Sequence, residues 1–402
     1  MVAPAEPQAR ILSDIEALCQ FQRGSASEGE REAARWVASR FKETGLDPEL
    51  ETFYFYPDYW NVWGAHMLGA LGAWLLLGRG SRRRRLLGAA ATSFLTASFW
   101  GDASARFYWL RRLFPARPSI NVLARLPNPQ ARRLLIVSGH IDAAHSGVVF
   151  HPAVQRWLQR RYAGGEMPPA LVLPFRGLLS LTAASILRAA GLPRPLAKTV
   201  ALPGVFISAA TVGFMADIGS RPTVPGANDD ASAVATVLAL AQELTADPPQ
   251  NLEVWFLATG CEEGIEGGIH DFLARHRAEL EGQRPFFLNL EMLGSGRPAY
   301  SQAEGHVTPF YMHPEAVSLV AEVGREPEFE GIEGMTSPAQ SDALAAHHYG
   351  FPAITIMSLA PDGQLPHYHW PSDTPENINV DSLGRCYRYL RRIIQRLDEE
   401  AG

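Results

Sequence analysis

The chain has 402 residues, enough for one large α/β domain with an insertion or for two ordinary domains, and enough to bury a sizeable core. Its formal charge of −6 gives no reason to expect a nucleic-acid partner, and its three widely spaced cysteines cannot form a disulfide framework. The first 30 residues lack the pattern of a cleavable secretory signal. We therefore expect a protein that stays inside the cell or one that an internal apolar segment directs to a membrane.

Apolar periodicity predicts two helices at the start of the chain, over 8–22 and 27–44, with Ser27 and Glu30 forming a capping box. Further on, apolar β-rich runs alternate with helical stretches. The predicted strands are Ile120–Leu126, Leu134–Ser138, Leu252–Ala258, Phe286–Asn289 and Ala353–Met357, and the predicted helices are Ala231–Leu244, Phe272–Leu280 and Asp381–Glu399. This alternation predicts an α/β fold with a mainly parallel central sheet flanked by helices on both sides.

Two apolar blocks interrupt this plan, and each predicts a helical hairpin. The first consists of Val62–Leu77 and Leu86–Trp100, joined by a turn that contains Arg82–Arg85. The second consists of Pro169–Leu187 and Val200–Met215. We therefore expect a main domain made of residues 1–57 and 118–402, with apolar hairpin insertions over 58–117 and 150–222.

The length of these apolar runs does not decide whether they lie in a membrane or inside a soluble protein. They are shorter than the roughly 20 residues of a comfortable membrane span, so a buried helical subdomain or a soluble dimer interface remains an alternative. Arginines at the hairpin tips and aromatic residues near the helix ends favour a membrane interface. The sequence thus favours membrane association over a cytoplasmic location. If the hairpins span, the positive-inside rule puts their Arg-rich tips in the cytoplasm and the main domain on the opposite side.

Polar residues that could carry chemistry follow several predicted strands, where ligands gather in α/β sheets. His140 follows the strand Leu134–Ser138, and a neutral imidazole suits zinc while nearby Asp142 could accept its other ring N–H. Taken alone, this pattern is better explained by a structural or incidental role. Glu262 and Glu263 follow the strand Leu252–Ala258, and such a pair suits one metal ligand and one general base. We expect the neighbouring Cys261 to be a small buried residue.

The remaining polar stretches contain further acidic residues and another candidate histidine ligand. Asp229 and Asp230 precede a predicted helix; helix capping is the expected role of Asp230, whereas Asp229 is expected to bridge two metals. Glu291 could supply an oxygen ligand and His369 a nitrogen ligand, with Asp373 orienting that histidine. Three further histidines are expected to be surface or core residues: His347, His348 and His367.

These stretches, in this order, resemble the co-catalytic dizinc aminopeptidase family of metallopeptidase clan MH, which includes aminopeptidase S, aminopeptidase Y and glutamate carboxypeptidase. The matching segments are SGHIDAA, PGANDDASAV, ATGCEEGIEGG, LNLEML and HYHWPSDT. The resemblance covers residues 8–55 and 118–400 apart from the second apolar block. It implies a zinc-exopeptidase fold of the phosphorylase/hydrolase-like type, with the main domain as a zinc peptidase domain.

The resemblance also implies roles for individual residues. One zinc ion is expected on His140 and Glu291 and a second on Glu263 and His369, with Asp229 bridging the two. Glu262 is implied as the general base and Tyr368 as a donor to the developing oxyanion, with Asp142 and Asp373 as partners of the two histidines. One departure is Glu291, where the family usually has Asp; Glu still ligates zinc.

The expected function is hydrolysis of a terminal peptide bond, favoured at the amino end, by a water that two zinc ions activate and Glu262 deprotonates. The expected partner is a peptide substrate, and the sequence does not predict an oligomeric state. One alternative is a metal-free binding or membrane-complex scaffold, which predicts a decayed ligand set. Another is a glutaminyl cyclase, a transferase on a related fold that works with one zinc.

Overall fold

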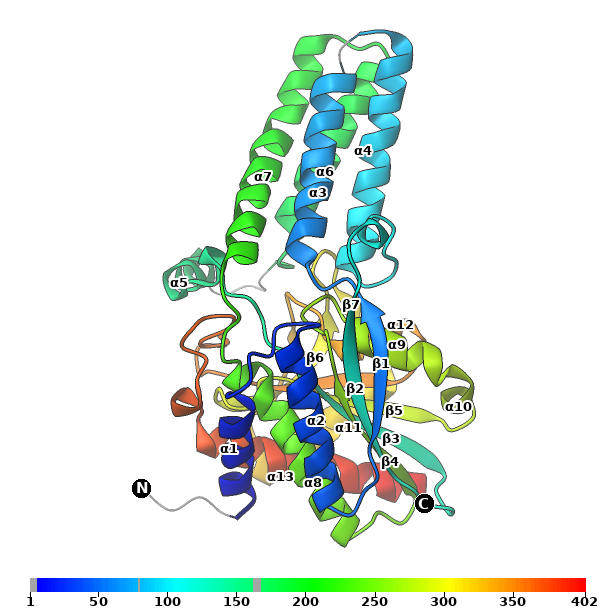
Figure 1. The fold of residues 1–402 in the computed structure, drawn as a ribbon, viewed down its shortest axis with the longest axis vertical. Coiled ribbons are helices and arrows are strands. Elements are labelled where there is room, and N and C mark those ends of the chain that lie inside the picture. The colour runs from blue at the N-terminus through cyan, green and yellow to red at the C-terminus, as the bar shows by residue number, and fades with distance from the viewer. Residues whose placement is uncertain (1–5, 79, 162–167) are drawn as a thin grey trace.

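The computed structural model describes residues 6–78, 80–161 and 168–402. A sheet covered by helices occupies one end of the molecule, and a bundle of long helices projects from the other (Figure 1). Within the described residues the sheet has nine strands in the order β1-β2-β4-β3-β5-β9-β6-β7, with β8 paired to β6. The strands are β1 (Glu49–Phe55), β2 (Arg117–Leu126), β3 (Arg133–His140), β4 (Leu252–Thr259), β5 (Pro285–Leu290), β6 (Arg297–Glu304), β7 (Phe310–Tyr311), β8 (Gly334–Thr336) and β9 (Ala353–Leu359).

The four central strands, β4, β3, β5 and β9, run parallel to one another, and the pairs that flank them are antiparallel. The central strands are continuous apolar runs with almost fully buried side chains, because helices cover both faces of the sheet. The predicted α/β class with a helix-flanked central sheet is confirmed, although its parallel part is limited to these four strands.

The helices that flank the sheet lie where the sequence predicts them, but their lengths do not always match the prediction. The predicted helix over Phe272–Leu280 is divided in two, because His276 leaves the helix and its Nε2 lies 2.7 Å from Glu51 Oε1. The helices of this domain are α1 (Glu6–Leu18), α2 (Glu28–Glu43), α8 (Ser232–Ala246), α9 (Gly267–Arg275), α10 (Arg277–Glu281), α11 (Pro314–Gly324), α12 (Asp342–His348) and α13 (Val380–Ala401).

The start of α2 carries half of the predicted capping box. Ser27 Oγ accepts a hydrogen bond from the Glu30 amide at 3.1 Å, as predicted. The Glu30 carboxylate turns the other way, into the domain, where it accepts hydrogen bonds from Ser119 Oγ and from the Cys261 amide. Glu30 is therefore a buried connection between α2 and the segment after β4.

The two apolar blocks form the predicted helical hairpins, and the hairpins join into one bundle (Figure 1). The first hairpin packs α3 against α4, the second packs α6 against α7, and the two meet where α3 contacts α7 and α4 contacts α6. The helices are α3 (Tyr59–Gly72), extended by a π-helical turn (Ala73–Leu77), α4 (Arg82–Ala103), α6 (Val172–Ala189) and α7 (Arg194–Ser220). A shorter helix, α5 (Pro152–Arg161), follows the helical turn Val148–Phe150, and that turn contacts α7.

Small and polar residues hold the bundle together. Gly204 of α7 meets Gly177 of α6 so closely that a Cβ on Gly204 would lie 2.6 Å from the Gly177 carbonyl oxygen. The Thr96 and Thr182 hydroxyls hydrogen-bond between α4 and α6 at 2.8 Å. Small residues that let backbones approach, joined by polar side chains, are typical of helix packing in membranes.

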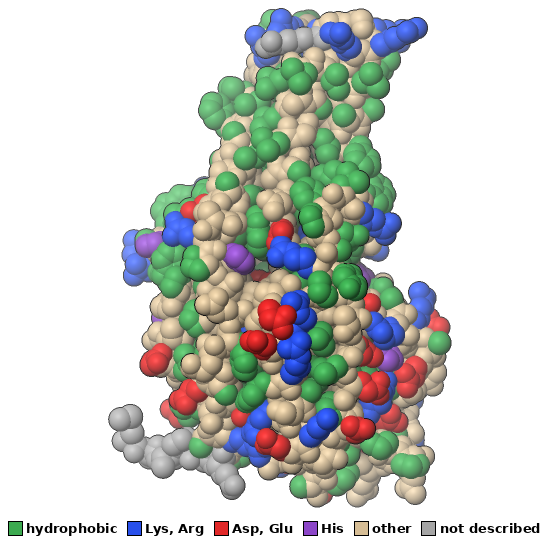
Figure 2. Space-filling view, viewed as in Figure 1, with side chains coloured by type: hydrophobic (Ala, Val, Ile, Leu, Met, Phe, Trp, Pro, Cys, Tyr) green, Lys and Arg blue, Asp and Glu red, His purple; other side chains and the backbone are tan. Residues whose placement is uncertain are grey.

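The outer surface of the bundle is apolar. Most of the large exposed apolar side chains of the described residues lie on its four helices, with Leu76 at 74% and Phe206 at 67% exposure. Figure 2 shows hydrophobic and uncharged side chains along the shaft, whereas Lys and Arg side chains gather at its far end. A surface of this extent and composition needs a covering partner.

The contact between Gly177 and Gly204 makes a testable prediction. Gly204→Ala should lower the midpoint of thermal unfolding, because the added methyl group overpacks the α6–α7 contact at a typical cost of about 1–3 kcal/mol. The matched control is Gly213→Ala on the same helix, where an added Cβ meets nothing within 4 Å. This control should be neutral or mildly stabilising, since Ala favours a helix. Equal effects of the two substitutions would contradict the close packing.

Candidate metal centre

The parallel strands bring the predicted site residues to one edge of the sheet. His140 is the last residue of β3, Glu262 and Glu263 follow β4, and Glu291 follows β5. These strands pair in parallel, so their carboxyl ends meet at the same edge. His369 arrives on the segment after β9, and Asp229 on the turn before α8. The convergence that the sequence predicts is present in the structure.

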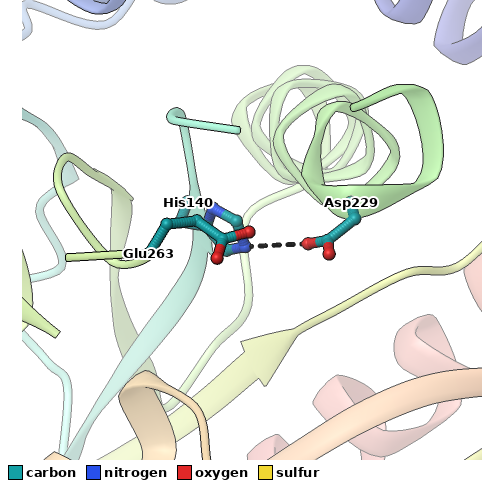
Figure 3. Close-up of side chains that lie close together, drawn as sticks. All are labelled: His140, Asp229 and Glu263. Carbon is teal, nitrogen blue, oxygen red and sulfur yellow. Dashed lines mark ion pairs between the residues drawn. The ribbon is translucent and has the colours of Figure 1, made fainter. Parts of the chain in front are cut away.

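Asp229 lies between the two histidines. Its Oδ1 is 3.2 Å from His140 Nε2, the contact drawn in Figure 3, and its Oδ2 is 3.1 Å from His369 Nε2. On the His369 side, the Nε2 atom also lies 3.2 Å from Glu263 Oε1. On the His140 side, the corresponding Nε2 atom lies 3.7 Å from Glu291 Oε2. The two oxygens of one carboxylate thus face two separate imidazoles, each with a glutamate of its own.

This arrangement fits zinc coordination. Zinc–ligand bonds of about 2.0–2.2 Å at tetrahedral angles place ligand atoms roughly 3.3 Å apart, close to the separations around Asp229. His140, Asp229 and Glu263 offer one set of ligand atoms within 4.8 Å of one another, and His140, Asp230 and Glu291 offer another. Although Asp229 Oδ2 is buried and near His369, it makes no hydrogen bond within the described ranges. That oxygen remains available to a cation.

The pKa shifts of the site residues reflect an excess of buried negative charge. Burial raises the pKa of Glu262 well above its ordinary value, and the neighbouring Glu291 and Glu263 raise it further against the opposing effect of His140. Burial lowers the pKa of His369, but Glu263 and Asp229 outweigh burial and raise it to about 10. Burial raises the pKa of Asp229, yet its contacts with the two histidines lower it overall. Positive charge is therefore favoured throughout this cluster.

Asp142 supports the site through its backbone and its carboxylate. His140 Nδ1 hydrogen-bonds to the Asp142 carbonyl oxygen at 3.0 Å, while the Asp142 carboxylate is 3.5 Å away. That carboxylate instead accepts hydrogen bonds from the amides of Glu262 at 3.0 Å and Glu263 at 3.1 Å. Asp142 thus contacts His140 through its backbone carbonyl rather than through the predicted carboxylate, and its carboxylate fixes the loop that carries the two glutamates.

Two aspartates have partners that the sequence did not predict. Asp373 does not contact the His369 ring; its carboxylate accepts hydrogen bonds from the amides of Asn228 at 2.8 Å and Asp229 at 3.1 Å. Asp230 does not cap α8, because its carboxylate accepts from the amides of His140 and Met292. Neither aspartate has its predicted partner: the Asp373 carboxylate binds amides of the turn over 227–231, whereas the Asp230 carboxylate points from that turn across the site.

Several site positions have a backbone conformation that non-glycine residues rarely adopt. Cys261, Met292 and His369 have φ values of 55°, 48° and 50°. Such conformations are unfavourable and cluster at functional sites, where surrounding contacts hold them. Cys261 itself is fully buried, and burial raises the pKa of its thiol well above its ordinary value. The expectation of a small buried residue is therefore confirmed.

Aromatic rings cover one side of the site. The Tyr368 ring stacks on His369 with centroids 3.8 Å apart, and Phe150 meets His369 edge-on at 4.5 Å.

His367 is half-buried, and its Nδ1 hydrogen-bonds to Ser372 Oγ. Neither His367 nor the His347–His348 pair of α12 belongs to the ligand sets found among the described residues, in agreement with the sequence prediction.

Arg23 and Glu30 are structural residues that sequence reasoning missed. Arg23 is fully buried and donates to the carbonyl oxygens of Ile141, Pro225 and Gly226, so it joins the end of β3 to the segment that precedes Asp229. Glu30 was interpreted only as a helix cap. The partners of both residues come from distant segments, so only the fold reveals these roles.

The α/β sheet gathers two histidines and a group of carboxylates at its strand ends, an arrangement suited to binding metal ions. Residues 208–394 match the family model "Peptidase family M28". The resemblance predicted from the sequence is confirmed.

Curated relatives match only part of the chain. Endoplasmic reticulum metallopeptidase 1 of Mus musculus is 28% identical over 184 residues, 43% of this chain and 19% of that protein. Aminopeptidase YwaD of Bacillus subtilis (strain 168) is 28% identical over 173 residues, 41% of this chain and 36% of that protein. The chain thus spans about a fifth of the first relative and about a third of the second.

Solved structures share the fold. An aminopeptidase from Aneurinibacillus sp. strain AM-1 aligns with a TM-score of 0.57 at 16% identity, over 96% of this chain and 93% of that one. BSAP, a zinc aminopeptidase from Bacillus subtilis, aligns with a TM-score of 0.55 at 14% identity, over 96% and 94%. A glutaminyl cyclase from Fimbriiglobus ruber gives 0.54 at 15% identity, over 98% and 99%. At these identities the likeness shows the fold alone.

Proposed function

We propose that the chain is a zinc-dependent exopeptidase that binds two zinc ions and hydrolyses terminal peptide bonds, with the amino end favoured. The observation that carries this proposal is Asp229, whose two carboxylate oxygens face His140 and His369 at 3.2 and 3.1 Å. A carboxylate between two imidazoles, each accompanied by another carboxylate, suits a bridging ligand of a two-metal site.

In this proposal His140 and Glu291 hold one zinc ion, Glu263 and His369 hold the other, and Asp229 bridges them. Glutamate at position 291 reaches the site with its longer side chain, and Asn289 Nδ2 donates to its Oε1 at 3.2 Å. Zinc bound there supplies Lewis-acid chemistry, which polarises a carbonyl group and makes water more acidic.

Two further side chains have proposed roles in the reaction. Glu262 has an Oε2 atom 3.9 Å from His140 Nε2, and the hydrogen bond from its amide to Asp142 holds its backbone. From this position Glu262 takes a proton from the attacking water and returns it to the leaving amine. Tyr368, stacked on His369, donates its phenolic hydrogen to the oxyanion that develops on the substrate carbonyl.

The alternatives differ in their metal requirement. A metal-free scaffold predicts a decayed ligand set, whereas all five proposed ligands and the base converge here. A glutaminyl cyclase is supported by one structural likeness of the same quality as those to aminopeptidases. A glutaminyl cyclase is expected to use one zinc. Because each carboxylate oxygen of Asp229 faces a different histidine, the geometry favours the two-metal exopeptidase.

The bridging role predicts that Asp229→Ala lowers the zinc content of the purified protein, because both metals lose a shared ligand. If Asp229 were only a helix cap, its loss would cost about 1 kcal/mol of stability and leave the metal content unchanged. Elemental analysis distinguishes the two roles. Asp47→Ala, at an exposed position before β1, is the control and should retain the wild-type zinc content.

Glu262→Gln should retain bound zinc and lose activity by about 100- to 10,000-fold, because the amide cannot accept the proton from water. The measurement is hydrolysis of aminoacyl-anilide and dipeptide substrates, with zinc content determined on the same preparation. Activity that persists in a zinc-loaded Glu262→Gln enzyme would show that another group is the base.

We also propose that the four-helix bundle lies in a lipid bilayer. Among the described helices, α6 and α7 are long and apolar enough to cross one, and only 28% of each apolar window is buried, unlike a core helix. The 22 residues of α4 extend about 33 Å, close to the hydrocarbon thickness of about 30 Å. Stretches 59–78, 86–101, 177–187 and 199–216 contain no Asp, Glu, Lys or Arg.

The charges at the far end of the bundle suggest its orientation. Arg82–Arg85 lie at the tip of the first hairpin, and Arg188, Arg194 and Lys198 lie near the tip of the second. By the positive-inside rule these tips face the cytoplasm, and the peptidase domain faces the opposite side. The site then lies close to the membrane surface, since Trp60 at the foot of α3 contacts His145, five residues beyond His140.

Membrane insertion predicts that the expressed protein stays in the membrane pellet after alkaline carbonate washing and enters solution only with detergent. Carbonate removes peripheral proteins but not inserted helices, whose apolar surface would otherwise meet water. A peripheral membrane protein in the same preparation provides the control. Release by carbonate alone would favour a soluble dimer interface or a protein partner as the cover of the bundle.

A further inference from the structure

Arg111 lies at the foot of the bundle, just after α4, and is fully buried. Its Nε and Nη2 form a two-pronged ion pair with Asp102 at 2.8 and 2.7 Å, and Asp102 also accepts a hydrogen bond from Trp63 of α3 at 2.8 Å. The remaining amino group, Nη1, donates to the carbonyl oxygens of Tyr56 and Gly264, both at 2.7 Å. Arg111 therefore connects two bundle helices to the residue that follows Glu263.

The loop that carries the glutamates is held at every residue from 261 to 265. Its first half is fixed by the peptidase domain: Glu30 accepts from the Cys261 amide, and Asp142 accepts from the next two amides. Its second half is fixed from the bundle side, where Arg111 donates to the Gly264 carbonyl and Tyr108 donates to the Ile265 carbonyl at 3.2 Å. The apolar insertion thus contributes the side-chain contacts of the second half of the loop.

The backbone of this loop explains why it needs such contacts. Ile265 and Glu266 have φ values of 75° and 58°, and Cys261 has 55°, a conformation that costs free energy in each of these non-glycine residues. A loop with several such residues keeps its shape only where its surroundings hold it. Loss of the bundle-side contacts would let the segment after Glu263 relax and carry the glutamates away from His140 and His369.

We propose that Arg111 is a positioning residue for the peptidase reaction, acting through the Gly264 carbonyl to hold Glu262 and Glu263 in place. The bundle is then part of the active-site support as well as a membrane anchor, and hydrolysis depends on its integrity. This inference rests on the proposed function of Glu262 and Glu263. The competing explanation is a purely structural ion pair, since breaking any buried pair destabilises a protein.

The test compares Arg111→Lys with Arg112→Lys, an exposed neighbour that serves as the matched control. Lysine keeps the charge but cannot form the two-pronged pair and reach both carbonyls at once. We expect kcat to fall about 10- to 100-fold in Arg111→Lys, as for residues that support metal ligands, with KM changed little. Arg112→Lys should behave like the wild type. A lowered unfolding temperature with wild-type kcat and zinc content would show a purely structural role.

Tyr108→Phe is the second variant, because it removes one hydrogen bond to the loop while preserving the ring that packs on Phe55. It remains informative if Arg111→Lys does not fold, and it should lower kcat several-fold at an unchanged unfolding temperature. Wild-type kcat in Tyr108→Phe would count against support of the loop from the bundle side.

Hydrogen exchange separates failure of this inference from failure of the proposed function. In the full-length protein in detergent, the amides of residues 260–266 should exchange faster in Arg111→Lys than in Arg112→Lys, whether or not the substrates are cleaved. Faster exchange without any wild-type peptidase activity would overturn the proposed function but keep the coupling. Unchanged exchange would overturn the coupling itself.

Discussion

Uncompensated negative charge in a buried pocket is the constraint on which the rest of the structure depends. Asp229, Glu262, Glu263 and Glu291 lie within a few ångströms of two imidazoles, and nearly all of these groups are shielded from water. Carboxylates so placed repel one another unless cations neutralise them. A cluster of this kind is suited to binding divalent metal ions.

Carboxylates around the site hold the segments that carry the proposed ligands, because they accept hydrogen bonds from the backbone amides of those segments. Asp142, Asp230, Asp373 and Glu30 each accept hydrogen bonds from amides of the segments that carry the site. Because each of these buried acceptors is fixed in the fold, their hydrogen bonds can hold the segments in unfavourable conformations. Together with Arg111, they connect the ends of the central strands, the turn before α8 and the foot of the bundle.

Local patterns in the sequence were sufficient to predict the central strands and the place of the site. Continuous apolar runs identified β3, β4, β5 and β9, and the polar residues after them identified the site. The antiparallel strands β1 and β6 lacked such runs and were missed. The partners of Asp373 and Asp230 could not be predicted, because tertiary structure sets the direction of those side chains. The packing of the two hairpins into one bundle could not be predicted either, because the apolar pattern of a hairpin is the same whether or not it packs against a second one.

The zinc content of the purified wild-type chain, measured by elemental analysis and paired with peptidase assays before and after chelation, tests the central claim most directly. The account predicts two zinc ions per chain and release of an amino-terminal residue that chelation abolishes and zinc restores. One zinc ion without peptidase activity would favour the cyclase-type chemistry. A chain that binds no metal and turns over no peptide would contradict the account and favour a scaffold.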